Sequence, residues 1–344
     1  MAISCVSVYA HLMRTLTDDT LTGMLRGPRA QGAFLLRTVM DPPWSLRIED
    51  GAPLSLITVI RGEAWLVPDE GEAVPLRPGE VAIARGPEPY TIGDTPGTPP
   101  HIVIHPGQRC TTLRGEKLRE SMNLGVRTWG ERPDGAALML SGTYQMHSEI
   151  GKRLLAALPP LLVRPAEAGD AALIALLAEE TGKGEPGQAL VLDRVLDLIL
   201  IRVLRSWLAR PGTGAPAWYR AQHDPVVGPA LRLLHEAPDH PWTVAELAAR
   251  TGISRAGLAR RFTELVGEPP MSYLTGWRLA LAADLLCESD TTISTVARKV
   301  GYGSSFALSA AFKRVRGLSP QDYRRRMLTG PLGAGEPDRL PAYA

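Results

Sequence analysis

The chain has 344 residues, 44% of them apolar, which is enough for two or three domains with cores of their own. Its longest apolar runs, such as residues 198–201 between Asp197 and Arg202, fall short of the ~18 residues that a membrane helix needs. This excludes a membrane-spanning protein, and the start also lacks the pattern of a secretory signal, so we expect a cytoplasmic one.

The net charge of +2 is distributed unevenly along the chain. Residues 225–330 carry 14 Lys and Arg against 9 Asp and Glu, which predicts a polyanionic partner for this third of the chain.

The three cysteines, Cys5, Cys110 and Cys287, are odd in number and widely spaced, so the sequence predicts no disulfide framework and a reducing compartment. Neither a CxxC nor an HExxH spacing occurs, and we expect no metal and no cofactor. Whether residues 1–12 belong to the native start stays open, since Met13 could also begin the chain.

Short β segments fill residues 34–105. Residues 54–60, 64–67 and 81–84 are apolar or alternating, and Gly, Pro or acidic turn residues bound each of them. Strands this short and regularly spaced predict an antiparallel sandwich or barrel rather than alternating β and α units.

From about residue 150 the apolar period becomes helical. One long helix is predicted at about 190–208, and its broad apolar face needs a partner. Two interpretations stay open for this face, packing on the β domain or a homodimer seam between two such helices. A Gly/Pro-rich linker follows at 210–217, and the last residues from 330 are expected to be disordered.

An internal repeat lies in the basic third, where residues 243–273 resemble residues 292–323. Gly252 matches Gly301 at an offset of 49, and at an offset of 50 the pairs are Phe262 with Phe312, Gly267 with Gly317, Pro270 with Pro320 and Tyr273 with Tyr323. The second copy therefore has one extra residue near its turn.

Each copy predicts a helix, a glycine turn and a second helix opened by a capping residue. In the first copy Thr243 caps a helix through Arg250, and Ser254 caps a helix that runs to about Leu265. This is the pattern of a helix-turn-helix, whose second helix enters the DNA major groove. The intervening helix at about 271–287 would be roughly 25 Å long, long enough to hold two such helices about one DNA turn, ~34 Å, apart. Two copies joined in this way within a basic segment are strong evidence, whereas a single copy would be weak.

The segments at 242–250, 254–262, 267–279, 300–302 and 311–320 resemble the AraC/XylS family of bacterial transcription regulators, over about residues 224–326. Residues 154–160 and 187–208 resemble the subgroup with an N-terminal cupin-type β-barrel. The resemblance implies an α+β chain with a cupin-like sensor barrel at 14–149, a helical dimerisation segment at 150–209, a linker at 210–223, a DNA-binding domain with two helix-turn-helix units at 224–328 and a disordered tail at 329–344.

The resemblance also implies which residues contact DNA. The base-reading positions fall on Ala256, Ala259 and Arg260 in the first unit and on Ser305, Phe306, Ser309 and Ala310 in the second. Ala310 departs from the family, which often has Arg or another polar residue there, so the second unit is expected mainly to hold the DNA backbone. Arg255 and Arg261 lie nearby for contacts with phosphates or bases, and Ser254 is also expected to contact DNA. The backbone contacts of the second unit are expected from Ser304, Ser305, Lys313 and Arg314.

Residues 59–63, 76–83 and 86–90 look like the two turns of a cupin. A cupin enzyme would need about three His or carboxylate ligands for its metal, but no His occurs from 12 to 100 and Tyr90 occupies the last ligand position. The barrel is instead expected to hold a small effector among Trp44, Trp65, Leu66 and Tyr90 or to support a dimer. Cys110 is a candidate redox sensor, because Arg109 and Arg114 would lower the pKa of its thiol.

These patterns predict a regulator, not an enzyme, that binds double-stranded promoter DNA as a homodimer, responds to a small effector or a redox signal, and contacts RNA polymerase. The family favours an activator. The alternative is a cupin-type oxygenase or isomerase with an appended DNA-binding domain, which a stoichiometric transition metal in the purified protein would favour.

Overall fold

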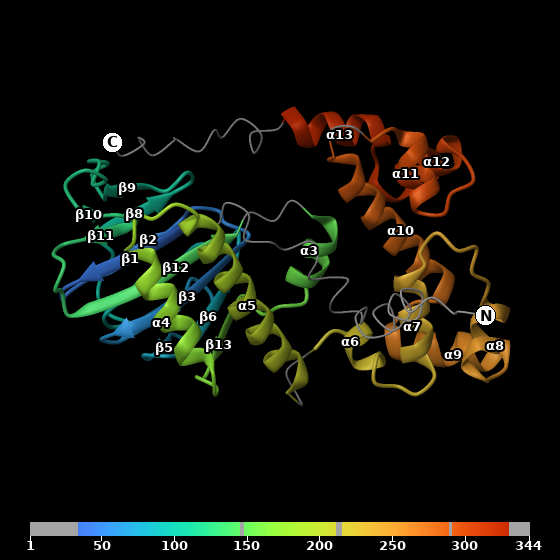
Figure 1. Cartoon of the computed structure of the whole chain (residues 1–344), viewed down its shortest axis with the longest axis horizontal. Coiled ribbons are helices and arrows are strands. Elements are labelled where there is room, and N and C mark those ends of the chain that lie inside the picture. The colour runs from blue at the N-terminus through green and yellow to red at the C-terminus, as the bar shows by residue number, and fades with distance from the viewer. Residues whose placement is uncertain (1–33, 145–147, 211–214, 289–290, 330–344) are drawn as a thin grey trace, which may run out of the picture. The chain divides into compact units, whose positions relative to one another are not determined.

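The computed structural model describes residues 34–144, 148–210, 215–288 and 291–329, and these form two compact units (Figure 1). The β unit contains the described residues of 34–144 and 155–210. The helical unit contains residues 148–154, 215–288 and 291–329. No described helix is both long and apolar enough to span a membrane.

Two sheets stacked face to face form the β unit. The first has the order β10-β11-β1-β12-β3-β6-β13 and the second the order β5-β4-β7-β2-β8-β9. Their bounds are β1 Phe34–Met40, β2 Ser45–Ile48, β3 Leu54–Arg61, β4 Ala64–Pro68, β5 Val74–Leu76, β6 Val81–Arg85, β7 Tyr90–Gly93, β8 Ile102–His105, β9 Arg109–Thr112, β10 Asn123–Gly125, β11 Thr128–Gly130, β12 Ala137–Tyr144 and β13 Leu161–Arg164.

The pairs are mostly antiparallel, as expected, except that β1 pairs with β11 and β2 with β8 in parallel. Alternating side chains of both sheets meet in one apolar core, in which Leu66, Leu76 and Met40 are fully buried. The predicted sandwich or barrel is therefore confirmed.

Helices α4 (Asp170–Thr181) and α5 (Gln188–Ala209) lie across the seven-stranded sheet (Figure 1). Gly142 in β12 permits the close approach, since a Cβ there would lie 2.9 Å from Leu196 Cδ2 of α5. The buried face of α5, including Leu196 and Ile199, thus packs within the β unit, as the first of the two interpretations predicted. A second stripe of α5 remains exposed at Leu190, Val191 and Leu198.

A buried ion pair ties these helices to β13. Asp170, at the start of α4, accepts hydrogen bonds from Arg164 Nη2 of β13 at 2.6 Å and from Arg202 Nε of α5 at 2.8 Å. Burial opposes ionisation of Asp170, but these bonds outweigh it and lower its pKa. Charges this deeply buried are tolerated because they are paired.

The helical unit contains the repeat that the sequence predicted. Its helices are α3 Glu149–Leu155, α6 Ala217–Ala221, α7 Val227–Glu236, α8 Val244–Thr251, α9 Arg255–Val266, α10 Pro270–Leu286, α11 Ile293–Lys299, α12 Ser305–Arg316 and α13 Pro320–Thr329. One apolar cluster surrounds Leu258 and Phe262 of α9, and another surrounds Leu308 and Phe312 of α12. Helix α10 contributes to both clusters and joins the two copies.

The segment at 150–209 differs from the expectation of one helical domain. β13 interrupts the helices there and pairs with β6, because Pro159 and Pro160 end the first helix before an alternating Leu161–Arg164 run. Residues 148–154 belong to the helical unit, because they pack on α10. Of the tail predicted at 329–344, Thr329 is the last residue of α13, and the remainder lies outside the described residues.

Candidate nucleic-acid interface

In both helix-turn-helix copies a serine side chain caps the start of the second helix. Ser254 Oγ accepts from Gly257 N and Ser304 Oγ from Ala307 N, each at 3.1 Å, so each serine caps the second helix of its copy. Gly252 and Gly301 make the turns with φ of 73° and 78°, a region that non-glycine residues rarely adopt. Both serines thus hold the start of an exposed helix in place.

Helix α9 is anchored on one side and exposed on the other. Leu258 and Phe262 are fully buried, four residues apart, whereas Arg255, Ala256 and Arg260 are exposed. In the described part of the chain, Arg255 and Arg260 form no ion pair. Two guanidinium groups are therefore available on the outer face of this helix, beside small side chains that let a partner approach closely.

Arg261, in contrast, is paired with a carboxylate of this chain. Its Nε lies 3.0 Å and its Nη2 2.6 Å from Asp224 Oδ2, and the same carboxylate accepts from Val226 N and Val227 N at the start of α7. These contacts, the Arg261 hydrogen bond first, lower the pKa of Asp224 to about 2. Arg261 was predicted to contact DNA. Its pairing with Asp224 was not predicted, because the two residues lie 37 positions apart in the sequence.

Helix α12 presents a different surface. Ser305, Phe306 and Ala310 are exposed, and Phe306 is 82% exposed, which is unusual for an aromatic side chain. The Ser309 hydroxyl donates to Ser305 O of its own helix at 2.8 Å. Lys313 and Arg314 are exposed near the end of the helix. The predicted residues therefore lie together, with apolar and small groups at the start of α12 and cations at its end.

A half-buried histidine of α7, which no sequence pattern indicated, supports α10. His235 stacks on Trp277 with ring centroids 4.3 Å apart, and its Nε2 lies 2.7 Å from the hydroxyl of Tyr273. Burial first, and the charge of Arg153 second, lower the pKa of His235 to about 3, so the imidazole is neutral.

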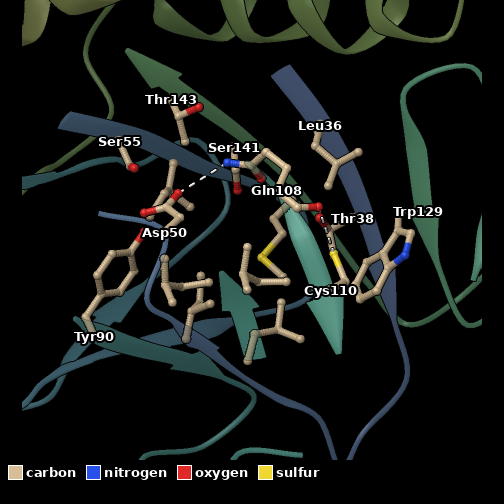
Figure 2. A pocket seen from close by; sticks show the side chains of 16 residues that line it. Leu36, Thr38, Asp50, Ser55, Tyr90, Gln108, Cys110, Trp129, Ser141 and Thr143 are labelled. Carbon is tan, nitrogen blue, oxygen red and sulfur yellow. Dashed lines mark hydrogen bonds between the residues drawn. The ribbon is translucent and has the colours of Figure 1, made fainter. Parts of the chain in front are cut away.

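The β unit contains a pocket with an empty volume of about 600 Å³, part of it open to solvent. Figure 2 shows Asp50 and Tyr90 at one end and Cys110 with Trp129 at the other. Gln108 Nε2 donates to Asp50 Oδ2 at 3.3 Å. Its lining combines apolar side chains with polar ones, and the latter are Thr38, Asp50, Ser55, Tyr90, Gln108, Ser141 and Thr143.

Two of the four predicted effector or redox residues, Tyr90 and Cys110, line this pocket, whereas Trp44 and Trp65 do not. Trp44 is 1% exposed in the core, and Trp65 alternates with the buried Ala64 and Leu66, so it points to the other face of β4. Leu66 likewise belongs to the core.

The thiol chemistry expected of Cys110 is corrected by the structure. Burial raises the pKa of its thiol to about 11, and the cation that opposes this is Arg119 rather than Arg109 or Arg114. The thiolate that oxidants attack is therefore scarce near neutral pH. Within the described residues, no group of three or more His, Cys, Asp or Glu side chains could hold a metal ion.

Comparison with known proteins agrees with both halves of this architecture. A cupin family model matches residues 19–209, and a helix-turn-helix domain model matches residues 247–326. An AraC-like transcription regulator of Streptomyces lividans is 33% identical over 313 residues, which cover 89% of this chain and 98% of that protein.

This chain belongs to the AraC-like transcription regulators. An RCS-specific helix-turn-helix transcriptional activator of Escherichia coli, RclR, is 27% identical over 90% of this regulator and 98% of the relative. Among solved structures, the DNA-binding domain of AdpA in complex with a target DNA is 34% identical, covers 30% of this chain and 94% of that one, and has a TM-score of 0.29. The two family matches and the similarity to AraC-like regulators make this regulator a DNA-binding protein with a cupin domain.

Proposed function

We propose that α9 and α12 enter two consecutive major grooves of promoter DNA. The observation that carries this is the repeat itself, in which each copy caps an exposed helix with a serine and anchors it by a buried Phe, 50 residues apart. Arg260 reads a base, because its guanidinium is exposed and can bind guanine O6 and N7 together. Arg255, Lys313 and Arg314 hold phosphates, and Phe306 makes an apolar contact, which suits a thymine methyl group.

Footprinting of the purified protein on DNA upstream of its own gene and its neighbours, at stated salt, tests this proposal. Protection over two adjacent major-groove turns is the expected result. Protection of a single turn would contradict the two-groove arrangement.

The signal is a small effector in the barrel pocket. Its lining fits an apolar body with one hydrogen-bond-donating end, because Asp50 is an acceptor and forms no ion pair among the described residues. The raised pKa of Cys110 favours this over direct oxidation. Alkyl amines, alcohols and carboxylates of equal chain length, compared by thermal shift, test the preference. We expect the amine to raise the thermal midpoint of the native protein but not that of the Asp50→Asn variant. An equal rise with the carboxylate would contradict the proposed preference for a hydrogen-bond donor.

The regulator acts in the cytoplasm as a homodimer in which a second copy covers the exposed stripe of α5 at Leu190, Val191 and Leu198.

The regulator activates transcription through contact with RNA polymerase. The name of the E. coli relative, a transcriptional activator, supports activation. Enzymatic activity of the barrel is the second candidate, and metal analysis of the purified protein tests it.

A further inference from the structure

Helix α3 comes from the N-terminal half of the sequence but is built into the helical unit. Its start is held by Asp284 of α10, whose carboxylate accepts from Ser148 Oγ at 2.7 Å and from Glu149 N at 2.6 Å. Asp284 therefore acts as a cap from a distant part of the chain, where a helix otherwise leaves its first N–H groups unpaired. No other helix start of this unit that the structure describes takes its cap from so far away.

Glu149 joins α3 to the second helix-turn-helix copy. One of its carboxylate oxygens accepts from Tyr323 of α13 at 3.1 Å and from Lys152 Nζ at 2.7 Å, and the other pairs with Arg316, the last residue of α12. Glu149 is only 9% exposed. Burial opposes its ionisation, but the bonds from Lys152 and Arg316 prevail and lower its pKa, so the carboxylate is charged when it holds Arg316.

The apolar side of α3 lies on the middle of α10. Ile150 is buried in a cluster with Trp277 and Ala280. Arg153 lies over Gly276, where a Cβ would be only 2.7 Å from its Nη2. The short helix thus touches the helix that connects the two copies and both later helices of the second copy.

We infer that α3 is a positioning element for DNA recognition, with Glu149 and Asp284 fixing α12 against α10 and hence fixing the offset between the two reading helices. Binding to two grooves is tighter when that offset is set beforehand, because each loosely held part adds to the entropy lost on binding. Glu149 comes from the N-terminal half of the chain, and among the described contacts it bonds to both α12, through Arg316, and α13, through Tyr323. This inference rests on the proposed two-groove function.

The test uses the full chain with Glu149→Gln, Arg316→Gln and the double variant, and Glu179→Gln as the matched control, since Glu179 is a carboxylate on an exposed face of α4. Affinity is measured for duplexes that span both half-sites and for duplexes that end after the first half-site. For the native protein the second half-site raises affinity, and we expect this gain to fall about 5–150-fold in Glu149→Gln, within the usual range of coupling between sites. The affinity for the first half-site alone stays unchanged, and the double variant loses no more than the single ones.

Hydrogen exchange of the free protein provides an arm that does not depend on DNA. In Glu149→Gln we expect faster exchange in α12 and α13 with α8 and α9 unchanged, and no change in the control. Unchanged exchange in α12 would overturn the inference, as would an equal loss of affinity for both duplexes. Faster exchange in α12 in a protein that protects only one groove would instead refute the two-groove function and leave the docking of α3 intact.

Discussion

Arg261 of α9 donates both its Nε and its Nη2 to the carboxylate of Asp224, with Nη2 2.6 Å from Oδ2. The neighbouring Arg260 has no such partner in the described part of the chain. Two adjacent arginines of α9 therefore differ: Arg261 is paired with a carboxylate of this chain, whereas the guanidinium of Arg260 is exposed and available for the DNA contact proposed above.

This difference can be measured for Arg260. Arg260→Ala should weaken binding to the specific operator by ~1–3 kcal/mol with a smaller effect on nonspecific DNA, and it should leave the thermal midpoint of the protein unchanged. The ratio of specific to nonspecific affinity, measured at one salt concentration, checks this. An unchanged ratio would refute a base-reading role.

Arg261→Ala should act on stability instead. It removes an ion pair that is half exposed at Arg261, so we expect only a small decrease in the free energy of unfolding, because solvent screens the pair. The native pKa of Asp224 lies below its unfolded value, so this contribution exists above pH 4 and disappears as the pH falls toward about 2. Urea unfolding of Arg261→Ala and the native protein at pH 7 and pH 3 would show the difference narrowing. A constant difference would contradict the assignment.

Arg314 should contribute through charge alone. Arg314→Ala is expected to weaken specific and nonspecific binding equally and to reduce the slope of log affinity against log salt by ~0.9. Arg205→Ala, on the exposed side of α5, serves as the control. A specific loss without a change of slope would indicate base contact.

Acid should weaken the helical unit through His235. Its native pKa of about 3 lies below the usual histidine value, so it stabilises the fold above pH 6.5, and this stability is lost as the pH falls toward 3. The loss should be about 1.4 kcal/mol per pH unit within that window. The free energy of unfolding, measured at pH 7.5, 6.5 and 5.5, should decrease as the pH falls in the native protein and decrease less in His235→Gln. The same dependence in both proteins would exclude His235 as its source.

The exposed stripe of α5 predicts the oligomeric state. Leu198→Glu should give monomers by light scattering, since a charge would be buried in the seam. Leu113→Glu, at another exposed leucine, should leave the dimer intact. Dimers that persist in Leu198→Glu would place the seam elsewhere.

The sequence allowed the two helix-turn-helix copies to be predicted nearly residue by residue, because caps such as Ser254 and turn glycines such as Gly252 act within three or four residues. The pocket was predicted less well. Asp50 and Gln108 meet across 58 residues, and no local pattern in the sequence indicates that contact. The contact between Glu149 and Arg316 spans 167 residues and leaves no local pattern.

The position of α3 has a practical consequence for work with fragments. A cut in the Gly/Pro linker would yield a C-terminal piece that lacks Glu149 and Ile150, so the Asp284 carboxylate, the Trp277 ring and the Arg316 guanidinium would each lose a partner. Such a piece would be an incomplete domain, and its DNA affinity would underestimate that of the intact regulator. A faithful minimal fragment would have to carry residues 148–154 joined by a new connection, as in a circular permutation.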